Sequence, residues 1–164
     1  MAAPVSPAAG HLVTEPDWDT EVYDRWVALG AGWTSWTPVW SCSVTPPSIG
    51  NGTLTGAYKA LGKTVEFRLR FVAGSTTTYG EGLWGFTLPS GYGPAVSQAA
   101  YGMAASAASA RYVLGVYLTA ANGIFRMVYG GTSGVRTNAG AGNDVPFEWS
   151  QNAQLLLGGV YEAS

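Results

Sequence analysis

The chain has little of what enzyme chemistry usually requires. Its 164 residues include one cysteine, Cys42, and one histidine, His11, and only 11% of its residues are charged. A single cysteine cannot form an internal disulfide, so no disulfide framework holds the fold. His11 lies in an Ala- and Pro-rich terminal stretch, and no G-x-S-x-G motif accompanies it. We therefore expect no hydrolytic triad and no enzymatic activity.

Metal and cofactor motifs are also missing from the sequence. The acids after residue 58 are scattered without ligand spacing, and the Gly-rich stretches lack the lysine of a phosphate-binding loop. Glu66, with Glu81 as a partner, is the best candidate for a carboxylate pair of the glycosidase type. Arg68 and Arg70 follow Glu66 along the same face of one strand, which favours a ladder of charges over an acid catalyst. We expect neither a cofactor nor a metal.

The scarcity of charge excludes several classes of protein. A disordered chain needs high charge and few hydrophobic residues, whereas 47% of this chain is hydrophobic. A helical bundle normally covers its outer faces with Glu, Lys and Arg. The net charge is −2 and the pI about 5.2, so no basic field is present to attract phosphates. Nucleic acid is therefore not expected as a partner.

Long apolar runs are absent as well. No uncharged apolar stretch reaches the roughly 18 residues that a membrane-spanning helix needs. The N-terminus has no basic start and no apolar run of signal-peptide length. We expect a protein that is not inserted into a membrane and that is made in the cytosol or leaves it by an unconventional route.

Glycine and aromatic residues are abundant. The chain contains 23 Gly, 7 Trp, 9 Tyr and 5 Phe. This composition is typical of short strands joined by tight turns. In the clearest strand, 63–73, apolar and charged side chains alternate. Further strands are predicted at 52–61, 83–88, 111–119, 124–130 and 153–162, with a hairpin turn at Asn122-Gly123. The predicted fold is all-β, a β-sandwich or jelly-roll-like head. The Ala-rich segment 95–110 is left open between helix and strand.

One helix is predicted before the strands, at about 15–29. Thr14 and Asp17 give a capping-box signal, and Gly30 is placed to end the helix. Four apolar residues form one stripe on this helix: Trp18, Val22, Trp26 and Leu29. A helix of about 15 residues is marginal by itself in water, so the stripe is expected to dock on a partner or on its own β domain. Residues 1–32 are predicted to be an attachment arm and residues 33–164 the head.

The aromatic residues offer one binding possibility. Eight of them are too many for a core of this size to bury entirely: Trp33, Trp36, Trp40, Tyr79, Trp84, Tyr92, Tyr101 and Trp149. Exposed aromatics in shallow clefts hold sugars in many proteins, and they also dock subunits. For any single one of them, a place in the core or in a subunit interface is the favoured interpretation.

Four motifs stand out in the first half of the chain: Trp-Thr-x-Trp-Thr-Pro at 33–38, the run from Ile49 to Gly56, Gly-Lys-Thr-Val at 62–65 and Gly-Ser-Thr-Thr-Thr at 74–78. Together they resemble a β domain of tailed-bacteriophage virion proteins, especially those of phages that infect actinobacteria. The ending from 146 to 163 is similar to the last strands of that domain. The arm is similar to a segment that opens many tail-fibre-like proteins, although Asp19 stands where that segment usually has Asn.

The resemblance implies a homotrimer of β-sandwich heads on the virion surface, attached to other virion proteins through N-terminal segments and lacking catalytic residues. It implies assembly in the host cytoplasm. A tail-tip or fibre protein, which contacts the host surface and its glycans, is favoured by the arm. A capsid decoration protein is favoured by the short length. A free carbohydrate-binding module is the further alternative, and the receptor-binding residues are left unassigned.

Overall fold

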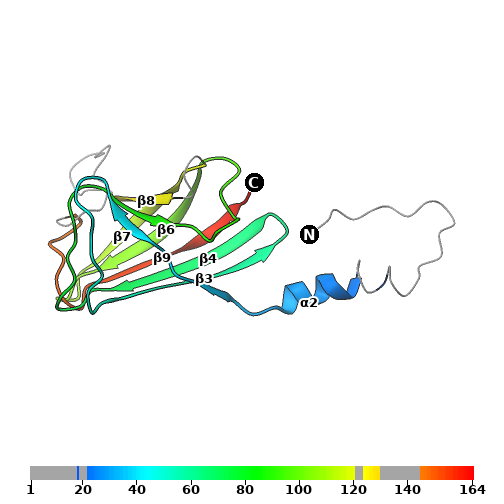
Figure 1. The fold of residues 1–164 in the computed structure, drawn as a ribbon, viewed down its shortest axis with the longest axis horizontal. Helices are drawn as coiled ribbons and strands as arrows, with labels where there is room; N and C mark the ends of the chain where they lie inside the picture. The colour runs from blue at the N-terminus through cyan, green and yellow to red at the C-terminus, as the bar shows by residue number, and fades with distance from the viewer. Residues whose placement is uncertain (1–17, 19–21, 121–123, 130–144) are drawn as a thin grey trace. The chain divides into compact units, whose positions relative to one another are not determined.

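The structure, a computed structural model, describes Trp18 and residues 22–120, 124–129 and 145–164. The chain divides into two units, residues 1–33 and residues 34–164. The first unit contains the helix α2, Asp24–Gly30. The second is built from antiparallel strands, so the prediction of an all-β fold with one short helix is confirmed (Figure 1).

Nine strands are present among the described residues. In chain order they are β1 (Thr34–Trp36), β2 (Trp40–Cys42), β3 (Thr53–Leu61), β4 (Thr64–Val72), β5 (Trp84–Thr87), β6 (Gln98–Ala105), β7 (Arg111–Leu118), β8 (Ile124–Tyr129) and β9 (Gln154–Glu162). Their spatial order is β1-β3-β4-β9-β6-β7-β8-β5-β2. The strands at the two ends of this order, β1 and β2, are separated by three residues in the chain. The segment 34–42 therefore pairs with β3 at its start and with β5 at its end.

Strand β4 has one side in the core and the other side on the surface. Its burial alternates strictly, with Val65, Phe67, Leu69 and Phe71 buried and the charged residues between them exposed. Strands β7 and β9 alternate in the same way. This period of two is the pattern that the sequence predicted for 63–73 and 111–119.

The core lies between strands that are distant in the sheet order. The ring of Phe71 on β4 has its centroid 5.0 Å from that of Trp40 on β2 and 6.2 Å from that of Trp84 on β5. Trp84 also packs against Trp149, at 4.8 Å. The two halves of the sheet thus face each other across aromatic side chains, as in a β-sandwich.

Two details differ from the sequence prediction, and one open question is decided. The Ala-rich segment, left open above, contains the strand β6. Segments β1 and β2 were not predicted as separate strands. Gly30 is the last residue of α2, and Ala31, with φ −58° and ψ 142°, ends the helix in an extended conformation. The predicted helix, about 15–29, therefore stops one residue too early. The hairpin turn at Asn122-Gly123 and most of the helix before Val22 lie outside the described residues.

Candidate functional site

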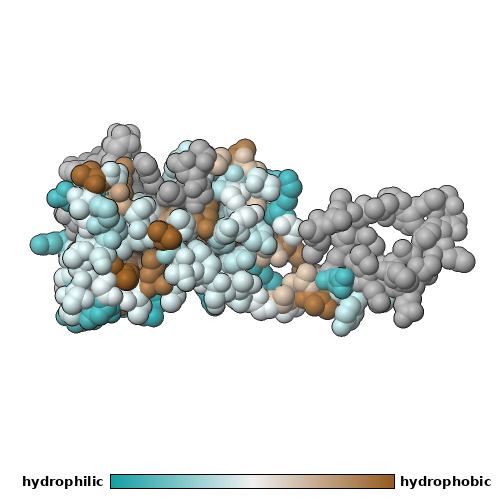
Figure 2. All heavy atoms as spheres, in the orientation of Figure 1, coloured by the Kyte–Doolittle hydropathy of each residue, from teal (hydrophilic) through white to brown (hydrophobic). Residues whose placement is uncertain are grey.

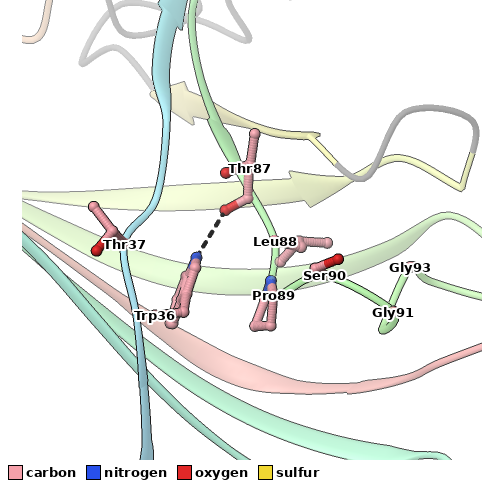
Figure 3. A pocket seen from close by; sticks show the side chains of 8 residues that line it. All are labelled: Trp36, Thr37, Thr87, Leu88, Pro89, Ser90, Gly91 and Gly93. Carbon is pink, nitrogen blue, oxygen red and sulfur yellow. Dashed lines mark hydrogen bonds between the residues drawn. The ribbon is translucent and has the colours of Figure 1, made fainter.

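A pocket of about 510 Å³ opens where the segment from β1 to β2 crosses the end of β5 (Figure 3). One wall is the crossing segment and the other is the loop that follows β5. The lining residues are Trp36, Thr37, Thr87, Leu88, Pro89, Ser90, Gly91 and Gly93. None of them is charged, so the pocket suits a neutral ligand better than an ion.

Trp36 is held firmly at this pocket. Its indole N–H donates to the backbone carbonyl of Thr87 at 3.3 Å, and Figure 3 shows this edge of the ring directed at Thr87. A Cβ added to Gly56 would overlap the six-membered ring of the indole, so Trp36 lies directly against the β3 backbone. The ring of Tyr58 meets it edge-on, with centroids 6.3 Å apart. The indole is a fixed, half-buried surface with its N–H already engaged.

Thr87 also holds the crossing segment in place. Its side-chain oxygen accepts a hydrogen bond from the Val39 N–H at 2.9 Å, and its own N–H donates to the Val39 carbonyl at 3.1 Å. Together with the bond from Trp36, three hydrogen bonds join this one residue to the segment between β1 and β2. The wall of the pocket is therefore built on main-chain pairing rather than on a free loop.

The opposite wall, residues 88–93, is anchored to the end of β9. The Tyr161 hydroxyl donates to the Tyr92 carbonyl at 2.8 Å, and the Ser164 N–H donates to the Gly93 carbonyl at 2.9 Å. Burial raises the pKa of Tyr161 far above its usual value, with smaller contributions from Tyr58 and Tyr92, so the hydroxyl keeps its proton. At the rim, Ser90 is exposed, and the described residues provide no hydrogen-bond acceptor for the Gly91 N–H.

A second feature is an apolar area on the outside of the sheet, which we call the outer apolar face. It consists of exposed residues on three adjacent strands: Tyr101 on β6, Val113 and Tyr117 on β7, and Val160 on β9. Val113 is 80% exposed and Tyr101 69%. Tyr101 lies in register between Gly158 on β9 and Gly115 on β7, so its ring has no side chain directly beside it. Exposed apolar residues that lie on neighbouring strands are typical of surfaces that contact other molecules.

The predicted charge ladder adjoins this face. Glu66, Arg68 and Arg70 lie on the outer side of β4, and Lys59 on β3 stands directly opposite Glu66. Arg68 and Arg70 line a second groove of about 510 Å³ with residues of β1, β3 and β9. Glu81 lies apart from this ladder, where its carboxylate accepts a hydrogen bond from the Thr45 hydroxyl at 3.0 Å.

The predicted attachment residues are largely exposed within the chain. Trp18 is 58%, Trp26 69% and Leu29 47% exposed, whereas Val22 is half-buried. Figure 2 shows apolar surface over α2 next to hydrophilic surface. The stripe belongs to the first unit of the chain, residues 1–33.

The remaining aromatics divide between core and surface. Trp84 and Trp149 are buried, and Trp40, Tyr79 and Tyr92 are half-buried against the core. Trp33 and Tyr101 are exposed. The sequence pointed to Trp36 as one of these eight and as part of the motif at 33–38, but not as a pocket residue. Its partners at 87–93 carried only the turn signal Pro89-Ser90-Gly91, because the pocket joins segments about fifty residues apart.

Among the described residues, no cluster of His, Cys, Asp and Glu side chains could hold a metal ion. Cys42 is half-buried and donates through Sγ to the carbonyl of Tyr79 at 3.3 Å. Burial raises the pKa of its thiol to about 11. No helix in the described part of the chain is long and apolar enough to cross a membrane.

The chain was compared with protein-family models, with curated proteins and with solved structures. None of the three comparisons gave a match. The features that bear on function are therefore the outer apolar face, the apolar stripe of the first unit and the Trp36 pocket.

Proposed function

We propose that this chain is a non-enzymatic structural protein of a tailed-phage virion. Its β-sandwich is a homotrimeric head on the particle surface, and residues 1–32 attach the head to other virion proteins. Within the virion we assign it to the tail tip or fibre, where it contacts the host surface. The motifs at 33–38, 49–56 and 74–78 support this class through their resemblance to such domains.

The observation that carries the proposal is the outer apolar face. Tyr101, Val113 and Val160 expose more than half of their surface on adjacent strands. Subunit interfaces are rich in aromatic residues and poor in charge at their centre. The outer apolar face is covered by other copies of the same head in this proposal, because the chain is poor in charge overall and the motif resemblance implies trimers.

Sedimentation of the full chain tests the assembly. We expect a species of three times 17.1 kDa at micromolar concentration. The double variant Val113→Lys with Val160→Lys places two charges on the outer apolar face, and it should give folded monomers. Ala107→Lys, in the exposed turn between β6 and β7, is the matched control and should leave the trimer intact. A monodisperse wild-type monomer contradicts the homotrimer.

Labelled antibody against the protein, applied to whole particles, tests the location. Label at the tail tip supports the fibre assignment. Label spread over the capsid replaces it with a decoration protein that ornaments or stabilises the shell. Particles that carry no label overturn the virion proposal.

A further inference from the structure

We propose that the Trp36 pocket binds a neutral saccharide unit, with one sugar ring stacked on the indole of Trp36. The proposed function supplies the biological purpose, contact with a host surface, but the binding itself is a property of the isolated chain. No residue of this pocket belongs to the outer apolar face or to the arm.

The indole of Trp36 is held in place by its neighbours. Its N–H is already bonded to the Thr87 carbonyl and its six-membered ring lies against Gly56. What remains for a ligand is the ring surface on the pocket side. The face of an aromatic ring carries partial negative charge, which attracts the polarised C–H groups of a sugar. Because Trp36 is fixed in advance, a ligand does not have to order it on binding.

The lining of the pocket is mainly apolar and uncharged. The pocket has no charged side chain, and it combines Trp36, Leu88 and Pro89 with the rim of Ser90 and Gly91. The hydroxyl of Ser90 and the N–H of Gly91 can bond the hydroxyl groups of a sugar whose apolar side rests on the ring. Sites of this kind are mainly apolar with a few polar groups that fix orientation.

A proline-rich peptide is the other ligand that a pocket lined by aromatic residues can bind. Such a peptide has backbone carbonyls that need donors from the groove. The indole donor of this pocket, the Trp36 N–H, is already bonded to the Thr87 carbonyl, which leaves the rim donors of Ser90 and Gly91. A stacked sugar does not need that donor, so the observations favour the saccharide.

Saturation-transfer NMR on the full wild-type chain tests the proposal. The probes are methyl glucoside, methyl galactoside, N-acetylglucosamine and maltose, with glucuronate as an acidic comparison and a proline-rich decapeptide as the competing ligand. Probe concentrations reach about 50 mM, where a millimolar dissociation constant gives nearly full occupancy. We expect at least one neutral sugar to receive saturation in its ring C–H protons.

Two variants locate the binding. Ser90→Trp places a large side chain at the exposed rim and should weaken binding at least tenfold, whereas Ala107→Trp, in a turn that lines no part of this pocket, should not. Gly56→Ala pushes the Trp36 ring out of its position and should also weaken binding. Circular dichroism shows whether each variant is folded. If Gly56→Ala fails to fold, Ser90→Trp still decides.

Three results overturn the inference: no signal from any neutral sugar, binding that Ser90→Trp leaves unchanged, or binding of the peptide alone. Each can occur while the particle labelling and sedimentation experiments succeed. The pocket and the virion function can therefore fail independently.

Discussion

Asn51 and Thr76 exchange hydrogen bonds in both directions across two turns. The Asn51 N–H donates to the Thr76 hydroxyl oxygen at 2.9 Å, and the Thr76 N–H and hydroxyl both donate to Asn51 Oδ1 at 3.0 Å. The Asn51 side-chain amide also donates to Ser75 Oγ at 3.0 Å. The motifs at 49–56 and 74–78, which the sequence offered as separate features, form a single corner of the fold.

We predict that Asn51→Ala lowers the free energy of unfolding by about 0.5–1.5 kcal/mol, because it removes three side-chain hydrogen bonds whose exposed partners can then bond water. Urea denaturation measures the change. Ser75→Ala removes one of these bonds and is the matched control with a smaller effect. In a double-mutant cycle, Asn51→Ala and Thr76→Val should not be additive. Additive losses would show that the pair does not act as a unit.

Cys42 is predicted to be a slow thiol. Burial raises its pKa from 9.0 to about 11, so near pH 8 the thiolate fraction falls about a hundredfold, and only the thiolate reacts. Alkylation by iodoacetamide at pH 8 should therefore be at least that much slower in the folded protein than in urea. Equal rates would contradict the burial of this side chain.

The same raised pKa predicts a loss of stability in alkali. Between pH 9 and 11 the unfolded chain gives up the Cys42 proton while the folded chain keeps it, so unfolding releases a proton and becomes easier as the pH rises. Denaturation in urea with a reductant, at pH 8 and at pH 10.5, measures this loss. Cys42→Ala should lose less stability over that interval, since the tyrosines still titrate. An identical loss in the variant would rule out Cys42 as a source.

The arm prediction concerns Trp18 and Trp26. Both expose more than half of their surface, and the hypothesis is that a partner covers them. We expect the double change of both to Ala to release the protein from particles while altering the unfolding free energy of the isolated protein by less than about 0.5 kcal/mol. Particle co-sedimentation and melting of the free protein measure the two effects. A melting temperature lowered by many degrees would mean that the helix is part of the chain's own core.

Glu66 is predicted to be dispensable for any reaction. It lies on the exposed side of β4 opposite Lys59, where a cross-strand charge pair contributes about 0.2–1 kcal/mol. Glu66→Gln should change stability or assembly by no more than that. Turnover of host wall polymer by the wild type, lost in a folded Glu66→Gln protein, would falsify the non-enzymatic proposal.

Sequence alone predicted the parts of the fold in which side chains alternate between two environments. From Val65 to Phe71, apolar and polar residues alternate in the sequence and burial alternates in the structure. Gly62 lies between the predicted strands 52–61 and 63–73, and its positive φ of 59° makes the turn between β3 and β4. Asn51-Gly52-Thr53 matches a glycosylation sequon, but Asn-Gly is also a turn signal. The structure places Asn51 in a turn with its amide engaged.

The composition of a segment does not predict its secondary structure where packing against neighbouring strands determines it. The Ala-rich segment has a helical composition, yet it forms β6, whose buried positions between β9 and β7 hold small residues. A Cβ at Gly102 would overlap the Leu157 side chain, and Ala104 is fully buried. The Trp36 pocket could not be predicted for another reason. Its two walls meet because the short link after β1 leads to β2, which pairs with β5 at the other end of the strand order.

The position of β9 has a consequence for the timing of folding. It is the last strand described in the chain, yet it lies between β4 and β6 and pairs with both. Until Glu162 has left the ribosome, the ladders on its two sides have no strand to join them. The head must therefore complete its fold after synthesis of this region rather than strand by strand during it. A ribosome-bound chain stopped before residue 154 should remain sensitive to proteases that the released protein resists.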